Sequence, residues 1–211
     1  MQRRGTSTRL GAILLHGRGS SARDILGLAS ALGLSDIAYI APEAPGNSWW
    51  PTSFLAPHAQ MAPWLDRGVA AIDQAVATLE ADGFRKDRIA ILGFSQGACL
   101  ALDYAARRPG LHSAIGLSGG LVGTGDADGT PTEALYGHID KRFDYGTDLT
   151  GLDVFIGCHE QDPHIPLARV HRSAEVLTTL GAKVQTDILP GPGHGIVPSE
   201  IDAVQNLWIS G

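Results

Sequence analysis

The stretch Ile89-Ala-Ile-Leu-Gly-Phe-Ser-Gln-Gly-Ala-Cys99 decides the fold of this chain. Residues 89–92 are apolar and have the composition of a short buried strand, whereas residues 98–107 are compatible with a helix. Between them lies Gly93-Phe-Ser-Gln-Gly97, which places Ser95 on a tight turn. A Gly-x-Ser-x-Gly pattern between a strand and a helix is typical of a nucleophile elbow, in which the serine hydroxyl is presented for attack.

The two glycines of this pattern have a steric reason. Residues two before and two after the serine come close to its backbone, and a Cβ atom at Gly93 or Gly97 would clash there. The helix that follows points free N–H groups and its positive end toward charge that develops near Ser95. An ordinary strand–helix turn is the alternative to this catalytic interpretation.

Strands and helices alternate outward from this stretch, which predicts an α/β fold: three α/β/α layers around a mostly parallel sheet. We find no internal repeat and no linker, so we expect a single domain over residues 1–211. The last strand alternates enough to lie at an edge of the sheet, and Ser199 is the expected N-cap of the closing helix. Expected strands are 11–15, 37–40, 89–92, 113–117, 154–157 and 183–189, and expected helices are 21–32, 65–79, 98–107, 167–180 and 199–209.

Two stretches are predicted as loops. Residues 42–64 contain five prolines together with Trp49, Trp50, Phe54 and Trp64. These aromatic residues are interpreted as the wall of a substrate pocket, with ordinary core packing as the alternative. Residues 119–151 contain eight glycines and little periodicity, which indicates a long loop or small excursion near the site.

A serine needs a base to remove its proton, and the base needs a carboxylate to hold it. In hydrolases with this elbow the chain order is serine, acid, histidine. The loop after the strand at 154–157 offers Asp162, and the loop after 183–189 offers His194 between two glycines. The competing side chains are Glu160 and Asp153 for the acid, and His159 and His164 for the base.

The oxyanion of a tetrahedral intermediate needs two hydrogen-bond donors. One is expected to be the backbone N–H of Gln96, directly after the nucleophile. The other is expected in the early segment Leu15-His-Gly-Arg-Gly19, where the flanking glycines free the backbone N–H of Arg18. We expect His16 to brace this loop by hydrogen bonds rather than to titrate in catalysis.

Composition excludes several other classes of protein. The 211 residues carry a formal net charge of −6 without a basic stripe, so nucleic acid is not an expected partner. No apolar run approaches 18 residues and the stretch 12–15 is too short for a signal peptide, so we expect no integral membrane contact and a cytoplasmic location. Cys99 and Cys158 follow no metal spacing and are expected as buried, reduced thiols.

With these segments in hand, the chain resembles the phospholipase/carboxylesterase family of α/β-hydrolases, which includes acyl-protein thioesterases and small bacterial carboxylesterases. The resemblance covers nearly the whole chain. It rests on Leu-His-Gly-Arg-Gly (15–19), Ala-Pro-Glu-Ala-Pro (41–45), Pro-Trp-Leu-Asp (63–66), Gly-Phe-Ser-Gln-Gly-Ala (93–98), Asp-Pro-His-Ile-Pro (162–166) and Gly-His-Gly (193–195).

This resemblance implies an α/β-hydrolase fold without a large cap domain, and cofactor-free hydrolysis of carboxylic or thio esters. It implies Ser95, Asp162 and His194 as a catalytic triad, and Arg18 and Gln96 as oxyanion donors. The expected partner is a small-molecule ester with a short or medium acyl group, with thioesters and lysophospholipids as further candidates. Arginine at position 18, where thioesterase relatives tend to be apolar, favours the small bacterial carboxylesterase branch.

Other interpretations remain open from the sequence. Gly17-Arg-Gly-Ser-Ser-Ala22, with Glu43 after the second strand, also fits a dinucleotide-binding fingerprint. A non-catalytic binding protein on a hydrolase fold is another alternative. A metal site is disfavoured because His159-Glu160 is followed by histidine one position too late, and Pro163 would break the helix that such a motif needs. Exposure of Trp49 and Trp50 would favour a homodimer.

Overall fold

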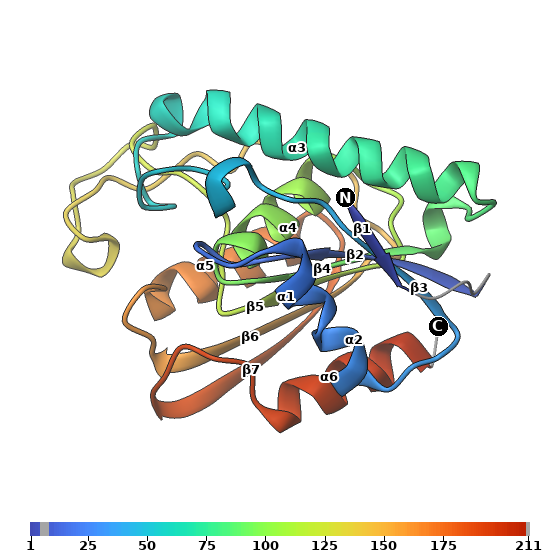
Figure 1. The fold of residues 1–211 in the computed structure, drawn as a ribbon. Helices are drawn as coiled ribbons and strands as arrows, with labels where there is room; N and C mark the ends of the chain where they lie inside the picture. The colour runs from blue at the N-terminus through green and yellow to red at the C-terminus, as the bar shows by residue number, and fades with distance from the viewer. Residues whose placement is uncertain (5–8, 210–211) are drawn as a thin grey trace.

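The computed structural model describes residues 1–4 and 9–209, and a seven-stranded sheet runs through its middle (Figure 1). The strand order is β1-β3-β2-β4-β5-β6-β7. The strands are β1 (Gln2–Arg4), β2 (Leu10–Leu15), β3 (Ile37–Ala41), β4 (Ile89–Phe94), β5 (Ser113–Leu117), β6 (Asp153–Gln161) and β7 (Lys183–Pro192).

All neighbouring strands are parallel except β1, which runs antiparallel to β3 with Gln2 opposite Ala41. The parallel strands therefore end at one common edge of the sheet, where ligand sites of such folds lie. The sequence did not indicate β1, because its three residues are all exposed and show no apolar alternation. The prediction that the last strand lies at an edge is confirmed, since β7 ends the sheet.

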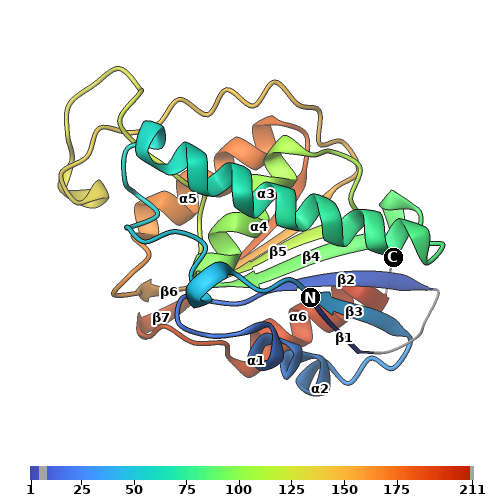
Figure 2. The same cartoon turned by 45° about the horizontal axis from the view of Figure 1, so that its top comes forward.

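Helices cover both faces of the sheet, which confirms the predicted three-layer α/β/α architecture (Figures 1 and 2). The larger core lies under α3 (His58–Ala81), α4 (Gln96–Arg107) and α5 (Leu167–Thr179). The smaller core lies under α1 (Ala22–Leu26), α2 (Leu28–Leu32) and α6 (Pro198–Ile209). None of the helices that the structure describes is long and apolar enough to cross a membrane.

Three helices differ most clearly from the sequence prediction. The expected helix over 21–32 is two short helices, α1 and α2, that meet at Gly27. Helix α3 begins at His58, inside the predicted loop, and contains Pro63, which removes one backbone hydrogen bond but does not end the helix. Ser199 is not an N-cap, because α6 already begins at Pro198 and the Glu200 carboxylate accepts the N–H of Val197 at 2.9 Å.

The long stretch 119–151, called the 119–151 segment below, leaves the sheet after β5 and contains only a short 3₁₀ turn, Glu133–Leu135. It passes beside the start of α3, where the N–H of His58 donates to the Thr124 carbonyl at 2.8 Å (Figure 2). The prediction of a long, irregular excursion is thus confirmed.

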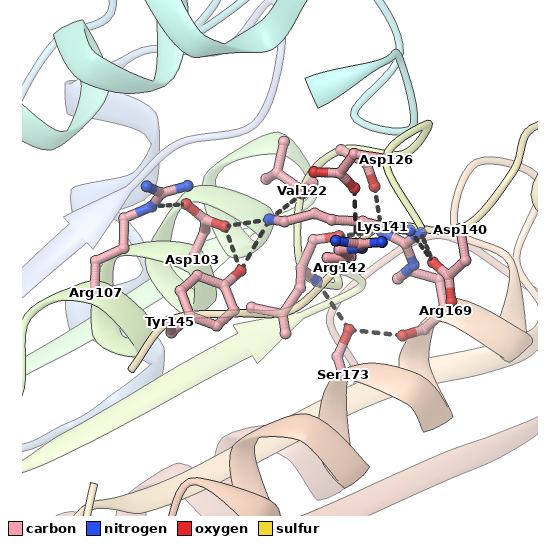
Figure 3. Close-up of polar contacts among 12 residues, drawn as sticks. Asp103, Arg107, Val122, Asp126, Asp140, Lys141, Arg142, Tyr145, Arg169 and Ser173 are labelled. Carbon is pink, nitrogen blue, oxygen red and sulfur yellow. Dashed lines mark hydrogen bonds and ion pairs between the residues drawn. The ribbon is translucent and has the colours of Figure 1, made fainter. Parts of the chain in front are cut away.

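Buried charges fasten this segment to α4 and α5 (Figure 3). Asp103 on α4 accepts hydrogen bonds from Arg107 (2.5 Å), from the Tyr145 hydroxyl (2.7 Å) and from the Lys141 ammonium (3.4 Å). Lys141 also donates to the Val122 carbonyl at 2.7 Å. Asp103 and Lys141 are both buried, so this contact is a buried ion pair between the segment and the core.

Arg169 on α5 forms the second attachment. Its guanidinium donates to the carbonyls of Leu121 (2.7 Å) and Gly123 (2.8 Å) and to the carboxylate of Asp140 (2.8 Å). Arg169 is fully buried, and it satisfies carbonyl groups that no regular element would pair. The two ends of the segment are therefore fixed from the helical layer, although its own backbone is irregular.

Candidate active site

The serine predicted at the elbow has the strained backbone that this turn requires. Ser95 has φ 54° and ψ −117°, a conformation that residues other than glycine rarely adopt. A Cβ atom at Gly93 would collide with the carbonyl of Gly97, and one at Gly97 would collide with the carbonyl of Leu15 at the end of β2. Glycine at both positions therefore lets α4 start directly against the sheet edge.

Ser95, His194 and Asp162 form one hydrogen-bonded chain. The Ser95 Oγ lies 2.9 Å from Nε2 of His194, and Nδ1 of the same ring lies 2.7 Å from the Asp162 Oδ2. The three side chains come from the end of β4, the loop after β7 and the loop after β6. Parallel strand ends thus bring together residues that are separated by up to 99 positions in the chain.

Asp162 is buried and held from its other side by the backbone. Its Oδ1 accepts the N–H groups of His164 (2.8 Å) and Ile165 (3.0 Å). Burial raises the pKa of Asp162, but hydrogen bonds from His194 and from these N–H groups lower it more, so the pKa lies below its usual value. Asp162 therefore stays ionised and fixed in orientation.

The two competing acids lie away from this hydrogen-bonded chain, whereas the competing base His164 packs beside His194. Glu160 accepts the N–H of Gly191 at 3.3 Å on the surface, and Asp153 stands at the start of β6, where it faces Lys183. The ring of His164 contacts the ring of His194 edge-on, with centroids 4.7 Å apart. Phe94 packs against the same ring at 5.2 Å. These two neighbours fix the plane of His194 between its hydrogen-bond partners.

A cavity of about 650 Å³ opens over Ser95. Trp50 and Phe54 line it, as the sequence predicted, but Trp49 and Trp64 are not among its lining residues. Tyr136, from the 119–151 segment, also lines the cavity. No periodic pattern in the sequence pointed to Tyr136, because the regular element next to it is only a 3₁₀ turn of three residues. Pro163, His164 and Ile165 close the side next to His194.

The two tryptophans that miss the cavity have other contacts. The Trp49 indole N–H donates to the His16 carbonyl at 2.9 Å, and the Trp49 side chain is 4% exposed. Trp64 is partly buried and lies under the guanidinium of Arg67, 3.9 Å from its ring centroid. Because Trp49 and Trp50 are both buried, the exposure that would have favoured a homodimer is not present.

His16 braces the loop that carries Arg18, as predicted. Its Nε2 accepts the N–H of Ala44 at 3.1 Å, and its Nδ1 lies 2.8 Å from the Gly17 carbonyl. This pattern corresponds to a neutral ring with the proton on Nδ1. Arg18 and Gln96, the predicted oxyanion donors, both line the cavity beside Ser95.

The side chain of Gln96 has a role that the sequence did not reveal. Its Oε1 accepts the N–H of Trp49 at 2.9 Å, and its Nε2 donates to the carbonyl of Trp50 at 2.8 Å. The first residue of α4 therefore holds the backbone of residues 49–50 against the nucleophile turn. An amide side chain both donates and accepts without carrying a charge, which suits glutamine to this position.

A side chain of the protein occupies the position at which the dinucleotide-binding fingerprint would hold a phosphate group. The N–H of Ala22, at the start of α1, donates to the Glu43 carboxylate at 3.1 Å, and Ser21 caps the same helix. Glu43 also contacts Asn47, so the position at which a pyrophosphate would bind already holds a carboxylate. Among the described residues, no three His, Cys, Asp or Glu side chains are grouped to hold a metal ion.

The predicted state of the cysteines is confirmed: Cys99 and Cys158 are free and buried. Burial raises the pKa of the Cys99 thiol to about 12, and burial together with Asp162 raises the pKa of Cys158. Both thiols are therefore protonated and poor nucleophiles. Of the hydroxyl and thiol groups named here, it is the Ser95 hydroxyl that contacts His194.

A comparison with known proteins identifies the family of this chain. A model of the phospholipase/carboxylesterase family matches residues 6–208. Acyl-protein thioesterase 1 of Gibberella zeae is 33% identical over 124 residues, which are 58% of this chain and 48% of that protein, so the chain spans about half the length of this curated relative.

Solved structures match over nearly the full length. A phospholipase/carboxylesterase from Dyadobacter fermentans is 35% identical, with a TM-score of 0.84, and the match covers 99% of this chain and 95% of that one. A carboxylesterase from Mesorhizobium loti shares the fold at 22% identity, with a TM-score of 0.72 and coverage of 99% and 93%. This chain therefore belongs to the phospholipase/carboxylesterase family and has the α/β-hydrolase fold.

Proposed function

We propose that this protein is a serine esterase that cleaves carboxylic esters through an acyl-enzyme on Ser95. The observation that supports it most directly is the hydrogen-bonded chain from Ser95 through His194 to Asp162, of which Ser95 and His194 line a cavity. The proposal assigns the three residues the roles of nucleophile, base and orienting acid.

In the first half-reaction, the Ser95 Oγ attacks the ester carbonyl carbon while its proton passes to Nε2 of His194. The Asp162 carboxylate accepts the N–H at Nδ1, which keeps Nε2 free to accept and stabilises the imidazolium that forms. The tetrahedral intermediate collapses when His194 returns the proton to the leaving alkoxide, and the alcohol departs.

In the second half-reaction, water attacks the acyl-enzyme and gives a proton to His194, which then protonates Ser95 as the acid leaves. In both steps the carbonyl oxygen becomes an oxyanion. We assign its two donors to the backbone N–H groups of Gln96 and Arg18. Gln96 is the first residue of α4, so its N–H has no partner within the helix.

The cavity supports a short or medium acyl group as substrate. Trp50, Phe54 and Ile165 supply apolar surface, and each methylene buried against such surface contributes about 0.8 kcal/mol. Activity should therefore increase with chain length until the cavity is filled. The thioesterase named among the relatives makes thioesters a second substrate class, and a matched pair of butanoyl ester and butanoyl thioester distinguishes the two.

The test compares wild type with Ser95→Ala on p-nitrophenyl butanoate. Removal of the nucleophile is expected to lower kcat by about 10⁴-fold or more. Ser30→Ala, which changes an exposed serine on α2, is the matched control. A serine-directed phosphonate should label wild type and the control but not Ser95→Ala. A Ser95→Ala protein that keeps a tenth of the activity would overturn the proposal.

A further inference from the structure

Among the described residues that line the cavity over Ser95, Arg18 is the one with a permanent charge. Arg18 lines the cavity, whereas none of its lining residues is an aspartate or a glutamate. The polar groups on the same wall as Arg18 are the neutral side chains of Ser20, Thr52 and Ser53. Although the protein has a formal net charge of −6, no carboxylate is among the described residues that line this cavity.

The guanidinium of Arg18 is held by neutral acceptors and not by an acid. It donates to the carbonyls of Pro51, at 3.1 Å, and Thr52. A guanidinium has five N–H groups, so these two bonds leave donors available. In the part of the chain that the structure describes, Arg18 forms no ion pair.

Two carboxylates that contact residues just after Arg18 have other partners. Asp24 accepts the hydroxyl hydrogens of Ser20 (3.2 Å) and Ser21 (2.7 Å). Glu43 accepts the N–H of Ala22. The charge of Arg18 is therefore not compensated by these acids, and its side chain is fixed with free donors at the cavity wall.

We propose that Arg18 binds a carboxylate carried by the ester substrate, so that the enzyme prefers esters with an anionic end over neutral esters of the same shape. This inference rests on the proposed esterase function and narrows its substrate class. A fixed, planar guanidinium with free N–H groups matches the two oxygens of a carboxylate, which accepts stronger hydrogen bonds than a neutral group.

Two pairs of substrates test the preference and locate the charge. Monomethyl adipate and methyl hexanoate differ only in a carboxylate or a methyl group at the end of the acyl chain. 4-Acetoxybutanoate and butyl acetate differ in the same way at the end of the alcohol. Acid release is followed at constant pH, and the readout is the ratio of kcat/KM for the anionic ester to that for its neutral partner.

The ratio is compared among wild type, Arg18→Gln, Arg18→Lys and the control Arg23→Gln, which removes an exposed cation on α1 outside the cavity. Because the backbone N–H of Arg18 is assigned to the oxyanion, absolute rates can change, but the ratio isolates the contact with the carboxylate. In at least one pair we expect Arg18→Gln to lower the ratio about tenfold or more. Arg18→Lys should retain part of the preference for the anionic ester. The ratio for Arg23→Gln should equal the wild-type ratio.

The inference is overturned if the ratio in both pairs is the same in wild type and Arg18→Gln. If Arg18→Gln then slows both members of each pair equally, Arg18 only fastens residues 51–52. This result leaves the esterase proposal standing, because neutral esters are still hydrolysed. Failure of the esterase proposal itself would appear as no Ser95-dependent hydrolysis of any of the four esters.

Discussion

Asp162 in the site and Asp103 under the 119–151 segment are both buried carboxylates with a lowered pKa, yet their surroundings differ. Asp162 accepts two backbone N–H groups and one imidazole, and that imidazole reaches the cavity. Asp103 is surrounded by Arg107, Lys141 and the Tyr145 hydroxyl.

The difference lies in what cancels the cost of burial. Burial raises the pKa of Asp103, and two cations together with the Tyr145 hydroxyl lower it again, so the carboxylate is neutralised and fixed in place. Asp162 is held by neutral dipoles, which leaves its negative charge available to a ring that gains a proton. The first arrangement fastens a segment of chain, and the second can support catalysis.

The largest effect that tests this comparison is expected for Asp162→Asn. The amide can still accept the N–H groups of His164 and Ile165, but it favours the wrong imidazole tautomer, so kcat should fall by about 10⁴-fold. The midpoint of urea unfolding should change little by comparison. Glu160→Gln, in the same loop, is the control and should stay close to wild type. If Glu160→Gln were the damaging variant, the assignment of the acid would be wrong.

Asp103→Asn should produce the opposite pattern. It leaves Lys141 and Arg107 buried or half-buried without a full counter-charge, so the free energy of unfolding should fall by about 3–5 kcal/mol. At temperatures at which the variant is still folded, its kcat should remain within a few-fold of the wild-type value. Asp73→Asn removes a partly exposed charge that faces Arg108, keeps an oxygen that can accept the Tyr104 hydroxyl, and should cost less than about 1 kcal/mol. Equal losses in the two variants would contradict a special role for the buried network.

A third buried carboxylate, Glu200, should make stability depend on pH. Burial raises its pKa from 4.5 to about 7, and Asp187 also raises it, against the lowering effect of the Val197 N–H. The folded chain therefore binds more protons than the unfolded chain between these values, and stability should decrease as pH rises through that window.

Glu200→Gln removes this titrating carboxyl group, so stability should depend less on pH. At pH 8 the variant should gain up to about 3 kcal/mol relative to wild type, and at pH 4.5 the two should be close. Urea unfolding at a series of pH values measures the effect. Glu175→Gln, at an exposed position on α5, should leave the profile unchanged, and a Glu200→Gln profile parallel to wild type would refute the shift.

The smallest expected effect separates two neighbouring residues. Trp50 lines the cavity, so Trp50→Ala should move the best p-nitrophenyl ester toward longer acyl chains, by about 0.8 kcal/mol for each added methylene that becomes buried. Trp49 contacts His16 and not the cavity, so Trp49→Ala should lower stability without changing the chain-length profile. A shifted profile in both variants would place both rings in the pocket.

The sequence predicted those parts of the molecule that depend on local pattern or on chain order. The elbow glycines were readable because a strained turn excludes Cβ atoms, and Asp162 and His194 were readable because each follows a strand in the expected order. Asp103 gave no such signal, because a single carboxylate in a helix is usually solvated and its partner Lys141 lies 38 positions away. Trp49 and Trp50 are adjacent, and contacts with residues distant in the chain, Gln96 and His16, hold their backbone and the Trp49 ring.

The attachments of the 119–151 segment have a consequence for protein engineering. Thr124 is held by the backbone at Leu55 and His58, and Lys141 is held by Asp103, so each side of the exposed tip at 126–132 has its own attachment to the core. The two sides are also joined directly, since the N–H of Ala127 donates to the Asp140 carbonyl at 3.0 Å. The entropic cost of closing a loop between two fixed points increases only slowly with the length of the loop. A peptide inserted at this tip, or a single cut in it, therefore leaves both halves docked, which makes the tip a site for tags, reporters or a split version of the protein.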